Sequence, residues 1–247
     1  DPATGVRALA GAPATIAAAA DVLPDLRELA ERAGLQPLVL TAGVDRARYH
    51  AACALAANGA TALCGAAVEV MRAGLALGVH LINDVYALRQ PGALKAVASS
   101  NAAVCLMHMQ GEPRTMQQAP HYVDVIAEVR DFLGERLQAC RAAGISDDRL
   151  LIDPGFGFGK TLPHNLALLR RLGELKTLGV PMLAGLSRKS MLAALTGRPV
   201  EARLAGSLAL ALAACEGGAR IIRVHDVAET VDALKVWRAF RDETTSS

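Results

Sequence analysis

The chain has 247 residues, a formal net charge of +2 and a hydrophobic content of 52%. This balance is typical of a globular protein, and the length allows one large domain or two small ones. The near-neutral charge gives no indication of binding to nucleic acid or to a charged membrane surface. The longest apolar stretches fall short of the ~18–20 residues that a membrane-spanning helix needs.

The cysteines and the amino-terminal sequence bear on the cellular compartment. Five cysteines are scattered along the chain without a CxxC pair, which favours reduced thiols over disulfides or a zinc site. The first residues, "DPATGVRALAG", lack the basic-then-apolar pattern of a secretory signal peptide. We therefore expect a cytoplasmic protein.

Short apolar runs alternate with helical periods along the chain. The runs are apolar at both alternating positions, which favours strands of a parallel sheet that is covered on both faces. They predict eight strands, at 6–10, 37–41, 61–65, 79–84, 103–108, 149–153, 181–186 and 219–224.

Capping residues and apolar stripes mark the helices between these strands. The clearest helix runs from about Asp124 to Ala143, with Gly144 behind it. Others are predicted from Asp21 to Gly34 and at 202–216 and 228–240.

Eight strands alternating with helices in about 250 residues match a (β/α)₈ TIM barrel in length and in count. Residues 1–247 contain no low-complexity linker, so we expect a single domain. An open, doubly wound α/β sheet is the alternative.

Polar side chains follow five consecutive predicted strands. In a barrel, the carboxyl ends of the strands carry the chemistry. The residues at these ends are Asn83 and Asp84, Met107 and His108, Asp153, Ser187 to Lys189, and Arg223 with His225 and Asp226.

Each of these groups also has a structural interpretation. Asn83 and Asp84 could shape a turn, as could Asp153 before a proline. His108, between two methionines, is more typical of a packed histidine than of a catalytic base. Arg188 and Lys189 could begin a solvated helix. Arg223 and His225 alternate on one strand face, a pattern that favours an anion site.

The stretch "LIDPGFGFGK" at 151–160 combines an acid, a lysine and three glycines after an apolar run. Gly159, Lys160 and Thr161 match the end of a phosphate-binding P-loop, but the first glycine of that motif would fall on Pro154. The P-loop interpretation therefore fails. No G-x-G-x-x-G follows the first predicted strand either.

Six segments together resemble the dihydropteroate synthase family in order and spacing, from about residue 79 to 237. They are "LINDV" at 81–85, "MHMQGEPRTMQ" at 107–117, "IDPGFGFGK" at 152–160, "HN" at 164–165, "SRKS" at 187–190 and "RVHDV" at 223–227. The resemblance implies a (β/α)₈ barrel, usually a homodimer. It also implies an enzyme of folate biosynthesis that is a target of sulfonamides. This enzyme would join p-aminobenzoate to 6-hydroxymethyl-7,8-dihydropterin diphosphate and release pyrophosphate.

The resemblance also implies a role for each matching residue. Lys189, Arg223 and His225 would be the catalytic group, and Arg223 and His225 would bind the diphosphate with Mg²⁺ assisting. Phe158 and Ser187 would lie beside the p-aminobenzoate. The pterin would be bound by Asn83, Met107, Asp153, Gly157, Phe158 and Lys189.

The first part of the chain departs from the family pattern. Residues 9–17 lack the "NVTPDSF"-like loop, whose asparagine serves the diphosphate and the metal, so no metal ligand is identified. Residues 40–50 lack a Ser-Thr-Arg-Pro segment, and 61–67 place Cys64 or Gly65 where the family has an aspartate.

Three hypotheses follow. The chain is an active synthase with divergent loops, or a relative that binds a pterin or a diphosphate without synthase activity. The third is a pterin-binding barrel that transfers methyl groups. Arg223 and His225 argue against the third, which needs no diphosphate site.

Overall fold

The structure is a computed structural model, and it describes the residues of two strands near the amino terminus and most of the chain beyond them. It describes the backbone of 12–16 and 35–39, and it describes 68, 71–72, 74–76, 78–113 and 115–241 with their side chains. The strands predicted at 6–10 and 61–65, the helix predicted from Asp21 to Gly34 and the departures at 40–50 and 61–67 lie outside these residues.

The chain divides into two compact units. The first contains residues 1–107, 112–115 and 135–151, and the second contains 108–111, 116–134 and 152–247. Strand β5 (Leu150–Asp153) begins in the first and ends in the second. Each unit is described by itself below.

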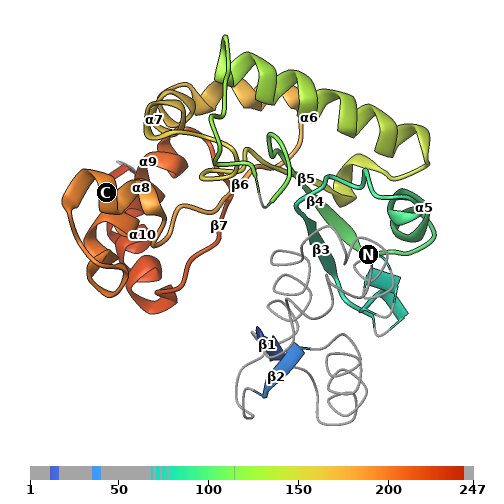
Figure 1. The fold of residues 1–247 in the computed structure, drawn as a ribbon, viewed down its shortest axis with the longest axis horizontal. Coiled ribbons are helices and arrows are strands. Elements are labelled where there is room, and N and C mark those ends of the chain that lie inside the picture. Colours follow the sequence, from blue (N-terminus) through green and yellow to red (C-terminus); the bar gives the residue numbers. More distant parts are fainter. Residues whose placement is uncertain are drawn as a thin grey trace, which may run out of the picture. The chain divides into compact units, whose positions relative to one another are not determined.

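Parallel strands are present in both units (Figure 1). In the first, β1 (Ala12–Ile16) pairs with β2 (Leu35–Val39), and β3 (Leu81–Asp84) pairs with β4 (Ala103–Met107). The sheet that contains β3 and β4 has the order β3-β4-β5.

In the second unit, β6 (Leu183–Ala184) pairs in parallel with β7 (Ile221–Ile222), and Ile152 forms a parallel bridge to Met182. The parallel pairing of these strands agrees with the prediction.

The strand bounds differ from the predicted ones in part. Strand β1 lies at Ala12–Ile16, where the sequence predicted the loop behind a strand at 6–10. Strands β6 and β7 have two residues each, so they are shorter than the runs predicted at 181–186 and 219–224, and loops follow them. Those loops carry the SRK and RVHD segments.

The helices agree better with the sequence. Helix α6 (Val125–Ala142) begins behind Asp124, whose Oδ1 accepts from the amide of Ile126 at 3.1 Å. It ends before Gly144, whose φ is +86°. Its predicted apolar stripe is buried apart from the half-buried Phe132.

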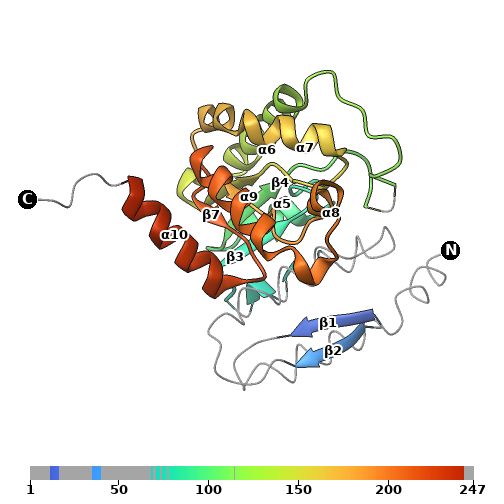
Figure 2. The same ribbon diagram turned by 90° about the vertical axis from the view of Figure 1, so that its left-hand side faces the viewer.

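Two further helices match the predicted ranges, and three were not predicted. Helices α9 (Leu204–Glu216) and α10 (Val227–Arg241) match, and they contact each other in the second unit (Figure 2). The fully buried positions of α9 are the small Ser207, Ala211 and Ala214 instead of its leucines. The helices not predicted are α5 (Ala93–Ala98), α7 (Leu162–Arg170) and α8 (Ser190–Thr196).

Short 3₁₀ helices connect several elements. They lie at η2 (Asp147–Arg149), η3 (Leu172–Leu178) and η4 (Val200–Ala202). No helix among the described residues is long and apolar enough to cross a membrane.

Candidate active site

Residues behind β5, β6 and β7 form a cluster of charged side chains in the second unit. Asp153, the last residue of β5, is buried, with 1% of its surface exposed. Its Oδ1 accepts from the amide of Gly155 at 2.8 Å, and its Oδ2 lies 3.3 Å from Nη2 of Arg223. A carboxylate has several acceptor positions, so it can accept further hydrogen bonds from a ligand.

Gly185 makes room for Arg223. A Cβ atom at position 185 would lie 2.7 Å from Nη2 of Arg223, closer than such atoms approach each other. The guanidinium therefore depends on a glycine in the loop behind β6 for its place beside Asp153.

Lys189 lies over the aromatic ring of Phe158. Its Nζ is 4.4 Å from the ring centroid, a distance at which the ring's π electrons attract a cation. Its stem passes Gly157, where a Cβ atom would lie 3.4 Å from Cδ of Lys189. Burial lowers the pKa of Lys189, and the charge of Asp153 partly offsets that effect. Asp153, Lys189 and Arg223 thus form one electrostatic group.

The glycine-rich segment 154–159 needs its glycines for backbone conformation. Gly155, Gly157 and Gly159 have φ values of +69°, +79° and +62°, the left-handed region that glycine adopts without strain. At Gly159 a Cβ atom would also lie 2.4 Å from the carbonyl oxygen of Gln110. The glycines therefore allow residues 155–159 to form a tightly turned segment beside Asp153, called the wall below.

Side chains from outside the segment hold this wall. Asn165 Oδ1 accepts from the amide of Gly157 at 2.8 Å, and its Nδ2 donates to the carbonyl of Lys160 at 3.1 Å. The buried hydroxyl of Tyr122 donates to the carbonyl of Gly159 at 2.8 Å. The backbone of the segment is thus fixed before any ligand binds, which is the preorganisation that a binding wall needs.

The loops behind β6 and β7 are joined by two side-chain contacts. Ser187 Oγ lies 2.9 Å from Nδ1 of His225 and accepts from the amide of His225 at 3.2 Å. Arg188 pairs with the carboxylate of Asp226. A helix does begin here, since Lys189 is the N-cap of α8, but the guanidinium of Arg188 is paired with a carboxylate.

Arg188 is held in the left-handed region, with φ of +57°. Its amide donates to Oγ of Ser207 at 3.0 Å, and its carbonyl accepts from Nη1 of Arg203 at 2.9 Å. These contacts fix the backbone between Ser187 and Lys189, so Arg188 supports the two predicted site residues that flank it.

Asn83 and Met107 lie in the first unit, on β3 and β4. Both are buried, with 3% and 0% of their surface exposed. Asn83 Oδ1 has no hydrogen-bond partner among the described residues. Since buried acceptors are nearly always paired, this oxygen is available to an N–H donor of a ligand.

Three of the structural interpretations are confirmed. Asp153 shapes a turn, because its Oδ1 accepts from the amide of Gly155, two residues further on. Asp84 shapes a turn, because its carboxylate accepts from the amides of Tyr86 and Leu88 at 3.1 and 2.7 Å. Burial raises its pKa, and these amides oppose that shift. His108 is a packed histidine, 6% exposed, with its ring edge-on to Phe132.

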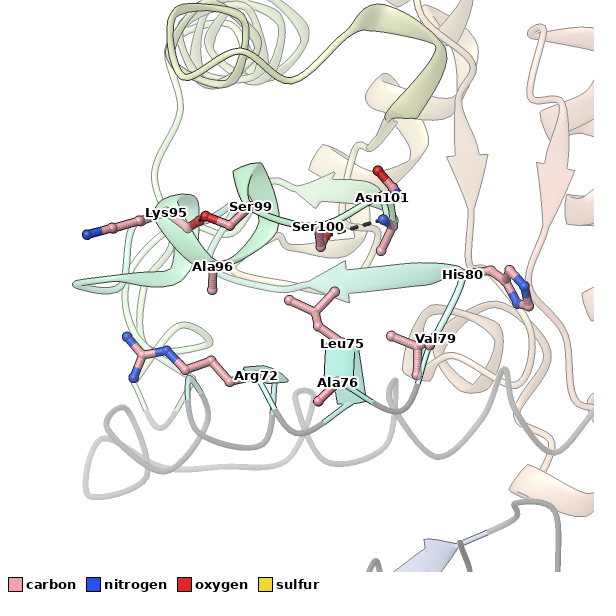
Figure 3. A pocket seen from close by; sticks show the side chains of 12 residues that line it. Arg72, Leu75, Ala76, Val79, His80, Lys95, Ala96, Ser99, Ser100 and Asn101 are labelled. Carbon is pink, nitrogen blue, oxygen red and sulfur yellow. Dashed lines mark hydrogen bonds between the residues drawn. The ribbon is translucent and has the colours of Figure 1, made fainter. Parts of the chain in front are cut away.

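A separate pocket in the first unit lies at the amino-terminal ends of β3 and β4 (Figure 3). Its walls come from residues 72, 75–76 and 78–80, from α5 and from the segment between α5 and β4. Arg72, Lys95 and Asn101 line it, and none of the predicted site residues does. It is therefore distinct from the charged cluster.

Sequence reasoning missed four residues that support this cluster: Tyr122, Asn165, Arg188 and Lys160. Asn165 and Arg188 stand in segments that carry the family resemblance, so their position in a motif was a usable signal. Nothing in the sequence around Tyr122 indicates its distant partner at position 159.

The comparisons with known proteins identify the family. Residues 65–225 match the model of the family described as "Pterin binding enzyme". The dihydropteroate synthase of Escherichia coli (strain K12) is 53% identical over 171 residues, which span 69% of this chain and 61% of the relative. The dihydropteroate synthase of Haemophilus influenzae is 44% identical over 216 residues, which span 87% of this chain and 76% of the relative.

Solved structures give the fold. The chain is similar to dihydropteroate synthase from Stenotrophomonas maltophilia, with a TM-score of 0.71, 42% identity and coverage of 96% of this chain and 95% of that one. The enzyme from Xanthomonas albilineans in complex with 7,8-dihydropteroate gives a TM-score of 0.68, 42% identity and coverage of 94% and 93%. These neighbours are (β/α)₈ barrels, so the predicted fold class is confirmed, and the chain belongs to the family of pterin-binding enzymes.

Proposed function

We propose that the chain is a dihydropteroate synthase, which condenses 6-hydroxymethyl-7,8-dihydropterin diphosphate with p-aminobenzoate and releases pyrophosphate. The observation that carries this proposal is the buried carboxylate of Asp153 between Arg223 and the preformed glycine-rich wall. The named relatives at 44% and 53% identity support it. The chain spans 61% of the length of its Escherichia coli relative.

The pterin would bind at Asp153 and Lys189. A pterin ring presents adjacent N–H donors on one edge, which a fixed carboxylate accepts, and acceptor atoms on another edge, which an ammonium meets. Asn83 Oδ1, buried and without a described partner, would accept a further N–H. Met107 and Gly157 would border the ring.

The diphosphate would bind at Arg223 and His225. Among the described residues, the guanidinium of Arg223 has one hydrogen-bond partner, Asp153, so other N–H donors remain for phosphate oxygens. The exposed ring of His225, held by Ser187, would bind the same anion.

The reaction would proceed by loss of the diphosphate. The C–O bond at the pterin methylene breaks, and its electron pair leaves with the pyrophosphate. The amine nitrogen of p-aminobenzoate attacks the methylene carbon, forms the C–N bond and loses a proton. Arg223 and His225 stabilise the leaving anion, which is the main contribution expected of preorganised cations. The amine is already a nucleophile, so no strong base is required.

We also propose that Mg²⁺ accompanies the diphosphate and that the enzyme is a homodimer. Among the described residues, no group of three His, Cys, Asp or Glu side chains could hold a metal ion. The diphosphate itself would supply most of the oxygen ligands that Mg²⁺ prefers. A molar mass from light scattering tests the dimer.

A second function, pterin binding without synthesis, is favoured by the sequence departures at 9–17, 40–50 and 61–67. One calorimetric experiment separates the two. The dihydropterin diphosphate is titrated with and without Mg²⁺, p-aminobenzoate follows, and released pyrophosphate is assayed. Binding with pyrophosphate release supports the synthase, and binding without release supports the second function.

A further inference from the structure

Lys160 ends the glycine-rich segment, and the proposed chemistry gives it no role. Its side chain is nevertheless buried, with 3% of its surface exposed. Nζ lies 2.9 Å from Nδ1 of His108, 3.0 Å from the carbonyl oxygen of Gly155 and 3.1 Å from that of Phe158. An ammonium has three N–H donors, and this geometry offers three acceptors.

The two carbonyls belong to residues on either side of Gly157. Lys160 therefore spans the turn that places Phe158 under the ammonium of Lys189. Removing the amine would leave two carbonyl oxygens without this donor, and a buried group that loses its partner destabilises the conformation that buries it.

His108 fixes the direction of the amine. Its backbone amide donates to the carbonyl of Asp153 at 2.9 Å, and its ring packs edge-on against Phe132 with 5.0 Å between centroids. The ring is thus held by packing, with Nδ1 toward Lys160. This explains why a histidine stands between two methionines at the end of β4.

We propose that Lys160, oriented by His108, is a positioning residue that holds the wall of residues 155–159 against Lys189. It would thereby shape the p-aminobenzoate side of the pocket. The inference rests on the proposed function, because that function gives Phe158 its ligand. It adds two residues to the site that do not touch the substrate.

The first test is Lys160→Met, which keeps most of the apolar stem and removes the donor. We expect the KM for p-aminobenzoate to rise at least about tenfold, in line with the loss of hydrogen bonds from a charged group. The KM for the dihydropterin diphosphate should change less. The control is Leu172→Ala, a buried residue of η3, which should lower Tm and leave both KM values unchanged.

Amide hydrogen exchange gives a readout that is independent of activity. In the wild type, the amides of Gly155, Gly157 and Phe158 are hydrogen-bonded. Lys160→Met should accelerate their exchange, whereas Leu172→Ala should not do so selectively.

A pair of His108 variants covers the case in which Lys160→Met fails to fold. His108→Asn keeps an acceptor for the amine and should retain most of the p-aminobenzoate affinity. His108→Phe keeps the ring and loses the acceptor, so it should weaken that affinity. Equal behaviour of the two variants would overturn the inference, as would unchanged exchange and an unchanged KM in Lys160→Met.

The proposed function and this inference can fail separately. If the wild type releases no pyrophosphate, the synthase proposal fails. The effects of Lys160→Met on exchange at 155–158 and on the binding of p-aminobenzoate by calorimetry then still decide the inference.

Discussion

The charge of Asp153 lies in a place where charge is costly unless it is paired. The carboxylate is 1% exposed and has Arg223 and the amide of Gly155 as partners. Such partners offset the free-energy cost of burying the ion. Removing the charge of Asp153 would leave the charge of Arg223 without its opposite partner. The residue therefore contributes to the stability of the wall, and under the proposed function it would also recognise the pterin.

We predict that Asp153→Asn abolishes measurable binding of the dihydropterin diphosphate. In asparagine an NH₂ donor replaces one of the two carboxylate oxygens, so the side chain cannot accept two parallel N–H donors, one on each atom. A charged hydrogen bond contributes about 1.5–3 kcal/mol. Calorimetric titration measures the effect. Asp148→Asn, at an exposed acid in η2, is the matched control and should bind as the wild type does. Near-wild-type affinity in Asp153→Asn would refute the pterin assignment.

Lys160 gives a pH dependence of stability. Burial lowers its pKa from the usual 10.5 to about 7; Asp153 opposes this shift and Lys189 adds to it. The unfolded chain therefore binds more protons than the folded one between about pH 7 and pH 10.5, so this residue makes stability rise with pH in that window. Below about pH 7, Lys160 makes its full destabilising contribution to the free energy of unfolding.

We therefore expect the free energy of unfolding of the wild type, relative to Lys160→Met, to increase from pH 7 to pH 10. Urea denaturation at several pH values measures it. A difference that stays flat over this range would show that the amine titrates normally in the folded protein.

At the scale of the element, helix α7 anchors the glycine-rich wall. Thr161 caps the helix, since its Oγ accepts from the amide of His164 at 3.3 Å, and Nδ1 of His164 accepts from the amide of Thr161. This reciprocal pair fixes the start of the helix and so the place of Asn165. The wall therefore depends on a helix that sequence periodicity did not predict.

We expect Thr161→Ala to cost about 1 kcal/mol of stability, the usual value for a lost cap, with little change in pterin affinity. Thermal unfolding and calorimetry measure the two effects. Thr177→Ala in η3, where the hydroxyl donates to the carbonyl of Glu174 instead of capping a helix, should cost less. A large loss of affinity in Thr161→Ala would mean that the cap positions the wall directly.

At the scale of the whole molecule, the departures from the family lie in the first part of the chain, and the charged cluster lies in the second unit. A related enzyme from Yersinia pestis has been solved in complex with a sulfonamide drug. A sulfonamide resembles p-aminobenzoate. Its affinity therefore tests whether p-aminobenzoate binding depends on the family residues that are missing at 9–17, 40–50 and 61–67.

We predict that sulfonamides bind this chain weakly, because residues 9–17, 40–50 and 61–67 lack the residues that the family carries there. Competition against p-aminobenzoate in the pyrophosphate assay measures the affinity. Tight inhibition would show that a competent pocket forms without those motifs.

The sequence by itself determined the fold class, helices α6, α9 and α10, and the candidates Asp153, Lys189, Arg223 and His225. These follow from local periodicity, from capping and from motifs, all of which are written in neighbouring residues.

Only the tertiary structure decided that Arg188 pairs with Asp226, that Tyr122 holds Gly159, and that Lys160 meets His108. The partners in these pairs stand 37 to 52 positions apart. Such contacts depend on burial and on the approach of distant segments, and no local pattern of residues encodes them.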